Sequence, residues 1–293
     1  MQSASATDIR QLIDVPLGVG ESPVWDERQG KLYFVDINAP AIFRLTPETG
    51  GLERWEMPSS IGSLGLCSDG RLIIALREGV HLFDPASGAF EFLVNPEPGV
   101  PTNRLNDGKV GPDGAFWVGT MDERPDKERI ASLYRVTADG HSTKMVEGLL
   151  VSNGLAWSAD GRTMWHSDSR QRFISVYDFE PATGTMANHR RVRTMTEAEG
   201  RPDGAACDAE GFYWSAGVSA GRLNRIAADG TIVEQVEMPC PAPTMPCFGG
   251  PDLRTLYVTS LQSGSTAGSL FALEVGVAGA PVGRFGTLRC QCT

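Results

Sequence analysis

The sequence predicts an all-β fold, a six-bladed β-propeller with four antiparallel strands in each blade. A short apolar strand core, preceded by a tight turn, is repeated six times along the 293 residues. Successive cores begin roughly 40 to 50 residues apart, which is the period of a four-stranded propeller blade rather than of a helical solenoid. No long helical period interrupts the pattern. The six cores begin at Leu32, Leu72, Phe116, Met164, Tyr213 and Leu256.

Each repeat supplies the elements of one blade in order. The turn before the core ends in glycine in five copies and in Leu253 in the sixth. The segment after the core alternates apolar and polar residues with period two, as the third strand of a half-buried blade should. A hairpin turn and a more variable fourth strand complete most repeats. The alternating segments are 42–45, 80–83, 133–136, 174–177, 223–226 and 270–273.

A ring of blades must close, because open first and last blades would expose sheet edges. The segment 9–14 precedes the first inner strand, so we expect it to form the outer strand of the last blade. The repeat covers nearly the whole chain, which favours a single domain over residues 1–293. We expect the propeller to span about 9–280, with a short tail over 281–293 that lies outside the core.

Composition excludes several classes of function. The net charge is −10 and the sequence pI is about 5.0, which disfavours nucleic acid and anionic membranes as partners. No apolar run approaches the roughly 20 residues of a membrane span, and the first residues lack the basic and apolar parts of a secretory signal. We therefore expect a soluble cytoplasmic protein, either a monomer or a weak homodimer.

The six cysteines indicate neither a disulfide framework nor a zinc site, because none are spaced as Cys-x-x-Cys. Cys67 and Cys207 fall in inner-strand segments, where a small buried hydrophobe is expected. Cys290 and Cys292 stand in the tail, and the sequence assigns them no role.

One register of the repeat carries oxygen ligands. The position eight residues before the turn glycine holds Asp, Glu or Asn in four of the six repeats, counted as nine residues in the first copy, which has one extra residue before its glycine. The second and sixth copies have Gly62 and Met245 there. The four polar residues at this register are Glu21, Asn106, Asn153 and Asp203.

Equivalent positions of different blades lie at the same height around a propeller axis, so these four side chains should meet at one mouth of the central channel. Two converging carboxylates repel each other, and a divalent cation removes that conflict. Oxygen ligands suit Ca²⁺, Mg²⁺ or Mn²⁺, with Zn²⁺ or Fe²⁺ also compatible. The alternative is that these residues only cap turns through bonds from side chain to backbone.

Six segments resemble the signatures of the regucalcin (senescence marker protein) and gluconolactonase family. They occur in order between about Leu17 and Thr259. The resemblance implies a six-bladed propeller that hydrolyses a sugar lactone with one divalent metal in its channel. The segments are Gly20–Trp25, Arg104–Lys109, Gly119–Met121, Ser152–Trp157, Pro202–Gly204 and Cys247–Gly250.

The resemblance also implies roles for individual residues. Glu21, Asn153 and Asp203 would be the metal ligands, and Asp203 would help to activate the attacking water. Arg104 and Asn106 would contact the substrate. The register of the repeat selects four of these five residues without the resemblance, since only Arg104 lies outside it.

One position departs from the family pattern. Relatives of the regucalcin type place a substrate-contacting Glu shortly after Gly-Thr-Met, but the corresponding residue here is Arg124. We therefore expect the adjacent Glu123 to contact the substrate. The charged loop 121–129 is the best candidate in the chain for a lid that faces the substrate, and the alternative is a solvated loop. The resemblance does not identify the sugar. Two other readings stay open: a non-catalytic Ca²⁺-binding propeller, and a propeller esterase or phosphotriesterase that uses the same metal site.

Overall fold

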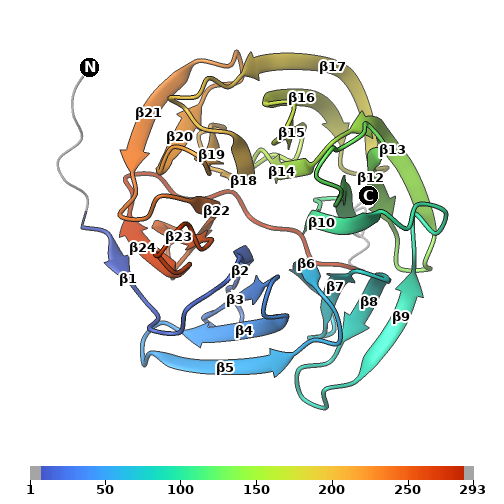
Figure 1. Ribbon diagram of the computed structural model, residues 1–293, viewed down its shortest axis with the longest axis horizontal. Helices are drawn as coiled ribbons and strands as arrows, with labels where there is room; N and C mark the ends of the chain where they lie inside the picture. The colour runs from blue at the N-terminus through green and yellow to red at the C-terminus, as the bar shows by residue number, and fades with distance from the viewer. Residues whose placement is uncertain (1–7, 287–293) are drawn as a thin grey trace, which may run out of the picture.

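The computed structural model describes residues 8–286, which form six four-stranded antiparallel sheets arranged as a ring around a central axis (Figure 1). The predicted six-bladed β-propeller is confirmed. In five blades the strands follow one another in sequence from the axis outward. Within residues 8–286 there is no helix long and apolar enough to cross a membrane.

The first three blades contain β2 to β13. The bounds in blade 1 are β2 Gly20–Asp26, β3 Lys31–Asp36, β4 Ala41–Thr46 and β5 Gly51–Glu56. Those in blade 2 are β6 Ile61–Leu66, β7 Leu72–Leu76, β8 Gly79–Phe83 and β9 Phe90–Val94. Those in blade 3 are β10 Asn103–Val110, β11 Phe116–Asp122, β12 Ala131–Val136 and β13 Ser142–Leu149.

The last three blades contain β14 to β24 together with β1. The bounds in blade 4 are β14 Ser152–Trp157, β15 Thr163–Asp168, β16 Phe173–Glu180 and β17 Thr185–Thr194. Those in blade 5 are β18 Pro202–Cys207, β19 Tyr213–Gly217, β20 Arg222–Ile226 and β21 Ile232–Glu237. Those in blade 6 are β22 Pro243–Gly249, β23 Thr255–Ser260, β24 Leu270–Glu274 and β1 Arg10–Gln11.

The ring closes as expected from segment 9–14. Strand β1 pairs antiparallel with β24, with Arg10 opposite Ala272 and Gln11 opposite Phe271. The amide of Leu12 continues the pairing by donating to the carbonyl of Leu270 at 2.8 Å. The first strand of the chain thus covers the outer edge of the last blade, which would otherwise be open.

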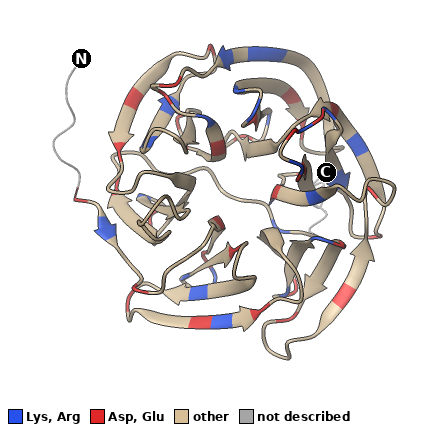
Figure 2. Ribbon diagram, viewed as in Figure 1, with Lys and Arg blue, Asp and Glu red and all other residues tan. Residues whose placement is uncertain are grey.

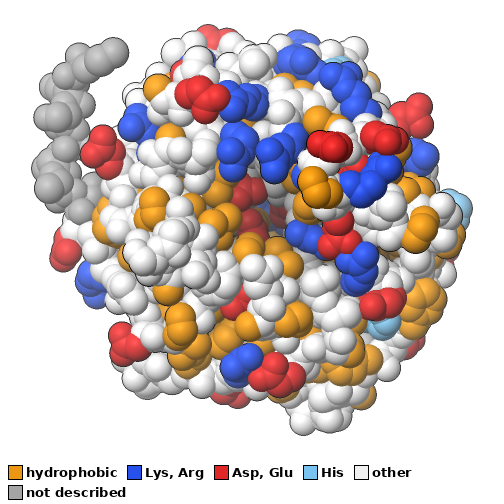
Figure 3. Space-filling model, in the orientation of Figure 1, with side chains coloured by type: hydrophobic (Ala, Val, Ile, Leu, Met, Phe, Trp, Pro, Cys, Tyr) orange, Lys and Arg blue, Asp and Glu red, His pale blue; other side chains and the backbone are white. Residues whose placement is uncertain are grey.

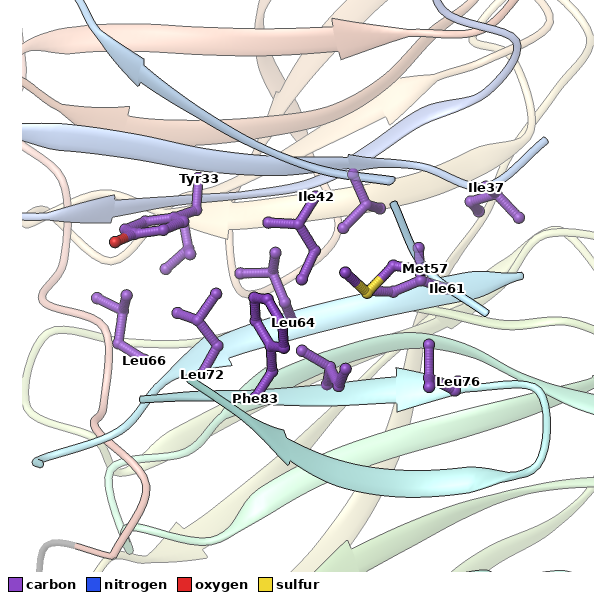
Figure 4. Packing of buried hydrophobic residues seen from close by; sticks show 13 residues of the cluster. Tyr33, Ile37, Ile42, Met57, Ile61, Leu64, Leu66, Leu72, Leu76 and Phe83 are labelled. Carbon is purple, nitrogen blue, oxygen red and sulfur yellow. The ribbon is translucent and has the colours of Figure 1, made fainter. Parts of the chain in front are cut away.

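The core lies between neighbouring blades rather than at one centre. Large apolar side chains of each sheet pack against the facing sheet, and Figure 4 shows this packing for blades 1 and 2. Removing a Leu, Ile or Phe side chain from water contributes about 1.5–3 kcal/mol before entropy is counted. This packing holds the inner strands at fixed positions around the axis. The labelled residues are Tyr33, Ile37, Ile42, Met57, Ile61, Leu64, Leu66, Leu72, Leu76 and Phe83.

Every inner strand carries a register shift near the same end of the channel. In blade 1 the shift falls between Glu21 and Val24, and in blade 4 between Asn153 and Ala156. A β-bulge changes the direction of side chains beside it, and such bulges are common next to active sites. The shifts in the other blades lie at Ile61/Ser63, Leu105/Gly108, Pro202/Ala205 and Pro243/Met245.

The segment after β24 differs from the expectation that the tail from 281 lies outside the core. It crosses the ring on the side of the tight turns, where Ala280 donates its amide to the carbonyl of Cys207 and Phe285 donates to that of Leu66. Phe285 is buried in the apolar cluster of blades 2 and 3. The expectation is wrong for residues 281–286, because an aromatic side chain here has an apolar site to fill. Cys290 and Cys292 lie outside the described residues.

Candidate metal centre in the central channel

The four polar residues of the repeat register come together at one mouth of the channel. Glu21 lies in β2, Asn106 in β10, Asn153 in β14 and Asp203 in β18, all on innermost strands. Nδ2 of Asn153 donates to Oδ1 of Asp203 at 2.7 Å, and Nδ2 of Asn106 lies 3.4 Å from Oδ1 of Asn153. In the space-filling view, acidic atoms lie at the floor of the central hollow (Figure 3).

The bulges hold two of these side chains through left-handed backbone. Ser22, which follows Glu21, has φ 49°, and Gly154, which follows Asn153, has φ 65°. The amide of Ser22 donates to Oε2 of Glu21 at 2.8 Å, while its hydroxyl accepts from the amide of Leu64 in the next blade at 2.9 Å. A non-glycine residue in this conformation is uncommon and is often part of a functional site.

Both carboxyl groups are destabilised as anions. Burial raises the pKa of Glu21 well above its usual value, and repulsion from Asp203 and Asp107 raises it further. Asp203 keeps part of its surface open to the mouth, but protein encloses the rest. Burial, followed by repulsion from Asp107, raises the pKa of Asp203 to about 7. Two acids in this state favour either protons or a bound cation.

The donor set fits a hard divalent cation. The amide nitrogen of Asn153 donates to Asp203 and, at 2.7 Å, to Oγ of Ser169. Its Oδ1 accepts only a long 3.4 Å hydrogen bond from Nδ2 of Asn106, which leaves a lone pair for a cation. Residues 8–286 contain no cluster of three or more His, Cys, Asp or Glu arranged to hold a metal. A cation at this mouth would be held by two carboxylates, Glu21 and Asp203, and by amide oxygen, a set that suits ions preferring oxygen.

Arg104 lies beside the candidate metal centre and contacts two neighbouring polar residues. One of its guanidinium nitrogens donates to Oδ1 of Asn106 at 2.9 Å, and its Nε lies 3.6 Å from Oε1 of Glu123. Glu123 also pairs with Arg77. Arg124 turns away and pairs with Asp122 and Glu128 in its own loop. Thus Glu123 rather than Arg124 faces Arg104.

Three further residues belong to the site region and were not singled out by the sequence. Ser169 accepts from Asn153 and donates to the carbonyl of Pro202 at 2.6 Å, which links blades 4 and 5. Asp107 is buried below Asn106, and its Oδ1 has no hydrogen-bond partner in the described chain. Lys109 donates to the carbonyl of Ala205 at 2.6 Å, and burial lowers the pKa of its ammonium. The Asp-x-Lys spacing after Asn106 was the available signal for the last two.

Other polar residues near the mouth are structural. Asp36 accepts from the amides of Gly18, Val19 and Asn38, and Asp168 accepts in the same way from four backbone amides, so both cap loops. His166 is fully buried, and its Nε2 lies 2.9 Å from the hydroxyl oxygen of Ser152. Burial lowers the pKa of His166 to about 4, which keeps it neutral.

The opposite end of the channel holds a separate cavity of about 260 Å³. Leu64, Cys207, Cys247 and Phe248 contribute to its lining, and residues 280–284 of the segment after β24 cover it. None of the four polar register residues lines this cavity. Convergent polar groups, rather than cavity size, identify the candidate site.

Fold and site together define a six-bladed propeller with an acidic, oxygen-rich centre at one mouth of its channel. The chain belongs to the SMP-30/gluconolactonase/LRE-like family, whose model matches residues 19–262. It is 36% identical over 281 residues to the 6-deoxy-6-sulfogluconolactonase of Pseudomonas putida, covering 92% of this chain and 96% of that protein. It is 34% identical over 265 residues to regucalcin of Xenopus laevis, covering 89% of each.

A solved structure has the same architecture. The crystal structure of a calcium-binding protein, regucalcin, from Agrobacterium tumefaciens superposes with a TM-score of 0.86 at 29% identity. The match covers 95% of this chain and 96% of the regucalcin. The predicted family and fold are therefore both confirmed.

Proposed function

We propose that this protein hydrolyses a small sugar lactone to the corresponding sugar acid and that the reaction depends on one divalent metal. The observation that carries the proposal is the convergence of Glu21, Asn153 and Asp203 at one mouth, beside Arg104 and Asn106. A propeller scaffold gains no stability from two buried carboxyl groups whose pKa values are raised by burial and by neighbouring carboxylates. Such a cost is typical of a functional site.

The relatives support this reaction class. The Pseudomonas putida relative is named as a lactonase of a sulfogluconolactone, and the Agrobacterium tumefaciens protein is described as calcium-binding. Calcium is accordingly the first metal to test, with Mg²⁺, Mn²⁺, Zn²⁺ and Fe²⁺ as further candidates that oxygen ligands accept.

Glu21, Asn153 and Asp203 would hold the cation. A bound divalent cation supplies Lewis-acid polarisation of the lactone carbonyl and stabilises negative charge that develops on its oxygen. Asp203, which is open to the mouth, would orient a water molecule and accept its proton as the water attacks the carbonyl carbon. Arg104 and Asn106 would position the hydroxyl groups of the sugar, and Glu123 would hold Arg104 in place.

A panel of aldonolactones tests the proposal, with proton release measured before and after chelation and after each metal is restored. The expected result is hydrolysis that chelation abolishes and one of the divalent ions restores. A phosphotriester and a simple aryl ester belong in the same panel. If they are turned over and the lactones are not, the site serves another hydrolase. If nothing is turned over while metal still binds, the protein is a binding propeller.

A further inference from the structure

The mouth of the channel carries two arginines that have no counter-charge in a direct contact. Arg170 follows β15 and is exposed, and Arg201 directly precedes β18 and is half-buried. Neither guanidinium makes a hydrogen bond or ion pair with the described residues. Three other basic side chains near this mouth have partners: Arg77 and Arg104 pair with Glu123, and Lys127 donates to the carbonyl of Asp122.

Ser169 links the two backbone segments that carry the unpaired arginines. Its hydroxyl donates to the carbonyl of Pro202, the neighbour of Arg201, at 2.6 Å, and it immediately precedes Arg170 in the chain. The amide of Arg170 donates to Oδ1 of Asp168 at 2.9 Å. The ends of β15 and β18 are thereby tied together at the edge of the candidate metal centre.

Both arginines lie near the candidate site. Arg201 stands two residues before Asp203, directly ahead of the innermost strand β18. Arg170 and Arg104 both lower the pKa of Lys127, so Arg170 also faces the loop over the mouth. Figure 3 shows basic side chains gathered beside the central hollow, although charges of both signs are spread around the rest of the ring (Figure 2).

We propose that Arg170 and Arg201 select a sugar lactone that carries an anionic group remote from its carbonyl. The proposal rests on the lactone hydrolysis proposed above, which places the carbonyl at Asp203 and leaves the far end of the sugar toward the rim. Carboxylate, sulfonate and phosphate share the required chemistry, since each accepts paired hydrogen bonds from a guanidinium.

The net charge of the protein bears on how an anionic substrate reaches the site. An acidic protein with a net charge of −10 otherwise repels anions. Two unpaired arginines at this mouth would therefore act against that repulsion where the substrate enters.

The test compares four lactones on the metal-loaded protein: gluconolactone and its counterparts with a carboxylate, a sulfonate or a phosphate at the terminal carbon. We expect kcat/KM for at least one anionic lactone to exceed that for the neutral lactone by about tenfold or more. The preference should decline as salt is raised. In the Arg170→Gln/Arg201→Gln variant the preference for the anionic lactone should largely disappear, mainly because the KM for that lactone rises.

Arg190→Gln is the matched control, because Arg190 is an exposed arginine on the outer strand β17. It should keep the ratio of anionic to neutral kcat/KM. If the double variant fails to fold, the single variant Arg170→Gln, which replaces an exposed side chain, takes its place. It should reduce the ratio of anionic to neutral kcat/KM several-fold. A wild-type protein without preference for any anionic lactone overturns the proposal, as does a double variant that folds and keeps the preference.

Failure of lactone hydrolysis itself is a distinguishable result. In that case, calorimetric binding of gluconate and of 6-phosphogluconate to the metal-loaded protein still tests the arginines. Tighter binding of 6-phosphogluconate that is lost in the double variant supports an anion-selective mouth. Equal binding of the two acids contradicts it.

Discussion

The side-chain amide of Asn153 on β14 donates a 2.7 Å hydrogen bond to the carboxyl group of Asp203 on β18, across the boundary between blades 4 and 5. The same amide nitrogen donates to Ser169, and the amide oxygen accepts only a long 3.4 Å hydrogen bond from Asn106, so it keeps a lone pair for a cation. One residue thus orients the acid of the neighbouring blade and offers an oxygen ligand of its own. Most of the expected behaviour of the site follows from this pair.

Removing a ligand should remove the metal. We expect Glu21→Ala and Asn153→Ala to lower the content of bound divalent ion strongly, because each deletes an oxygen donor from a small set. Elemental analysis of the purified variants measures this directly. Full occupancy in both variants would contradict the assignment of Glu21 and Asn153 as ligands.

Removing Arg104 should affect turnover but not the metal. Arg104 contacts Asn106 and Glu123 rather than the carboxyl groups that would hold the ion. In Arg104→Ala, the metal content should stay near that of the wild type while lactone kcat/KM falls by about tenfold or more. Wild-type kcat/KM across the lactone panel would mean that Arg104 has only a structural role.

Metal affinity should depend on pH with a defined sign. The pKa of Asp203 is raised to about 7 and that of Glu21 is also raised, so protons compete with the ion for both groups. Affinity should therefore fall as the pH drops through about 7, by up to about tenfold per pH unit for each displaced proton. Calorimetric titration on both sides of this pH checks it. Equal affinity at both pH values would show that these carboxyl groups are ionised without the metal.

The left-handed bulge after Asn153 should be a sensitive point of the fold. A Cβ at Gly154 would lie 2.2 Å from the hydroxyl oxygen of Tyr213 and 2.4 Å from Oγ of Ser167. At Gly211, also left-handed with φ 88°, a Cβ would meet nothing within 4 Å. We expect Gly211→Ala to cost about 1 kcal/mol of unfolding free energy and Gly154→Ala at least about 2 kcal/mol more. Denaturant unfolding of both variants measures the difference, and equal losses would contradict the steric account.

The sequence predicts the features that repeat. The period of the blades, the closing strand and the shared register of Glu21, Asn106, Asn153 and Asp203 are all visible because six copies are compared with one another. A residue whose role occurs in only one blade gives no repeated pattern in the sequence. Ser169 matters because its hydroxyl reaches Pro202 in the next blade, a contact set by how two sheets pack.

Backbone conformations that occur at one position only, and contacts between residues distant in sequence, could not be predicted because they do not repeat from blade to blade. The left-handed backbone of Ser22 is accompanied by a hydrogen bond with Leu64, 42 residues away. No local turn motif in the sequence predicts this conformation. Phe285 belongs to no repeat, and its burial follows from an apolar space that only the assembled blades 2 and 3 create. The position of Glu123 beside Arg104 likewise depends on the path of a loop rather than on a strand register.

Turnover by Asp203→Asn at saturating metal tests the central claim most directly. Asparagine is close to aspartate in size and still offers an oxygen ligand, so the variant should fold and bind some metal. It cannot accept a proton from water, and general-base assistance contributes about 10²- to 10⁴-fold. We predict a loss of kcat in that range with the best lactone of the wild-type panel. A kcat within about threefold of the wild type would contradict the role of Asp203 as the base that activates water.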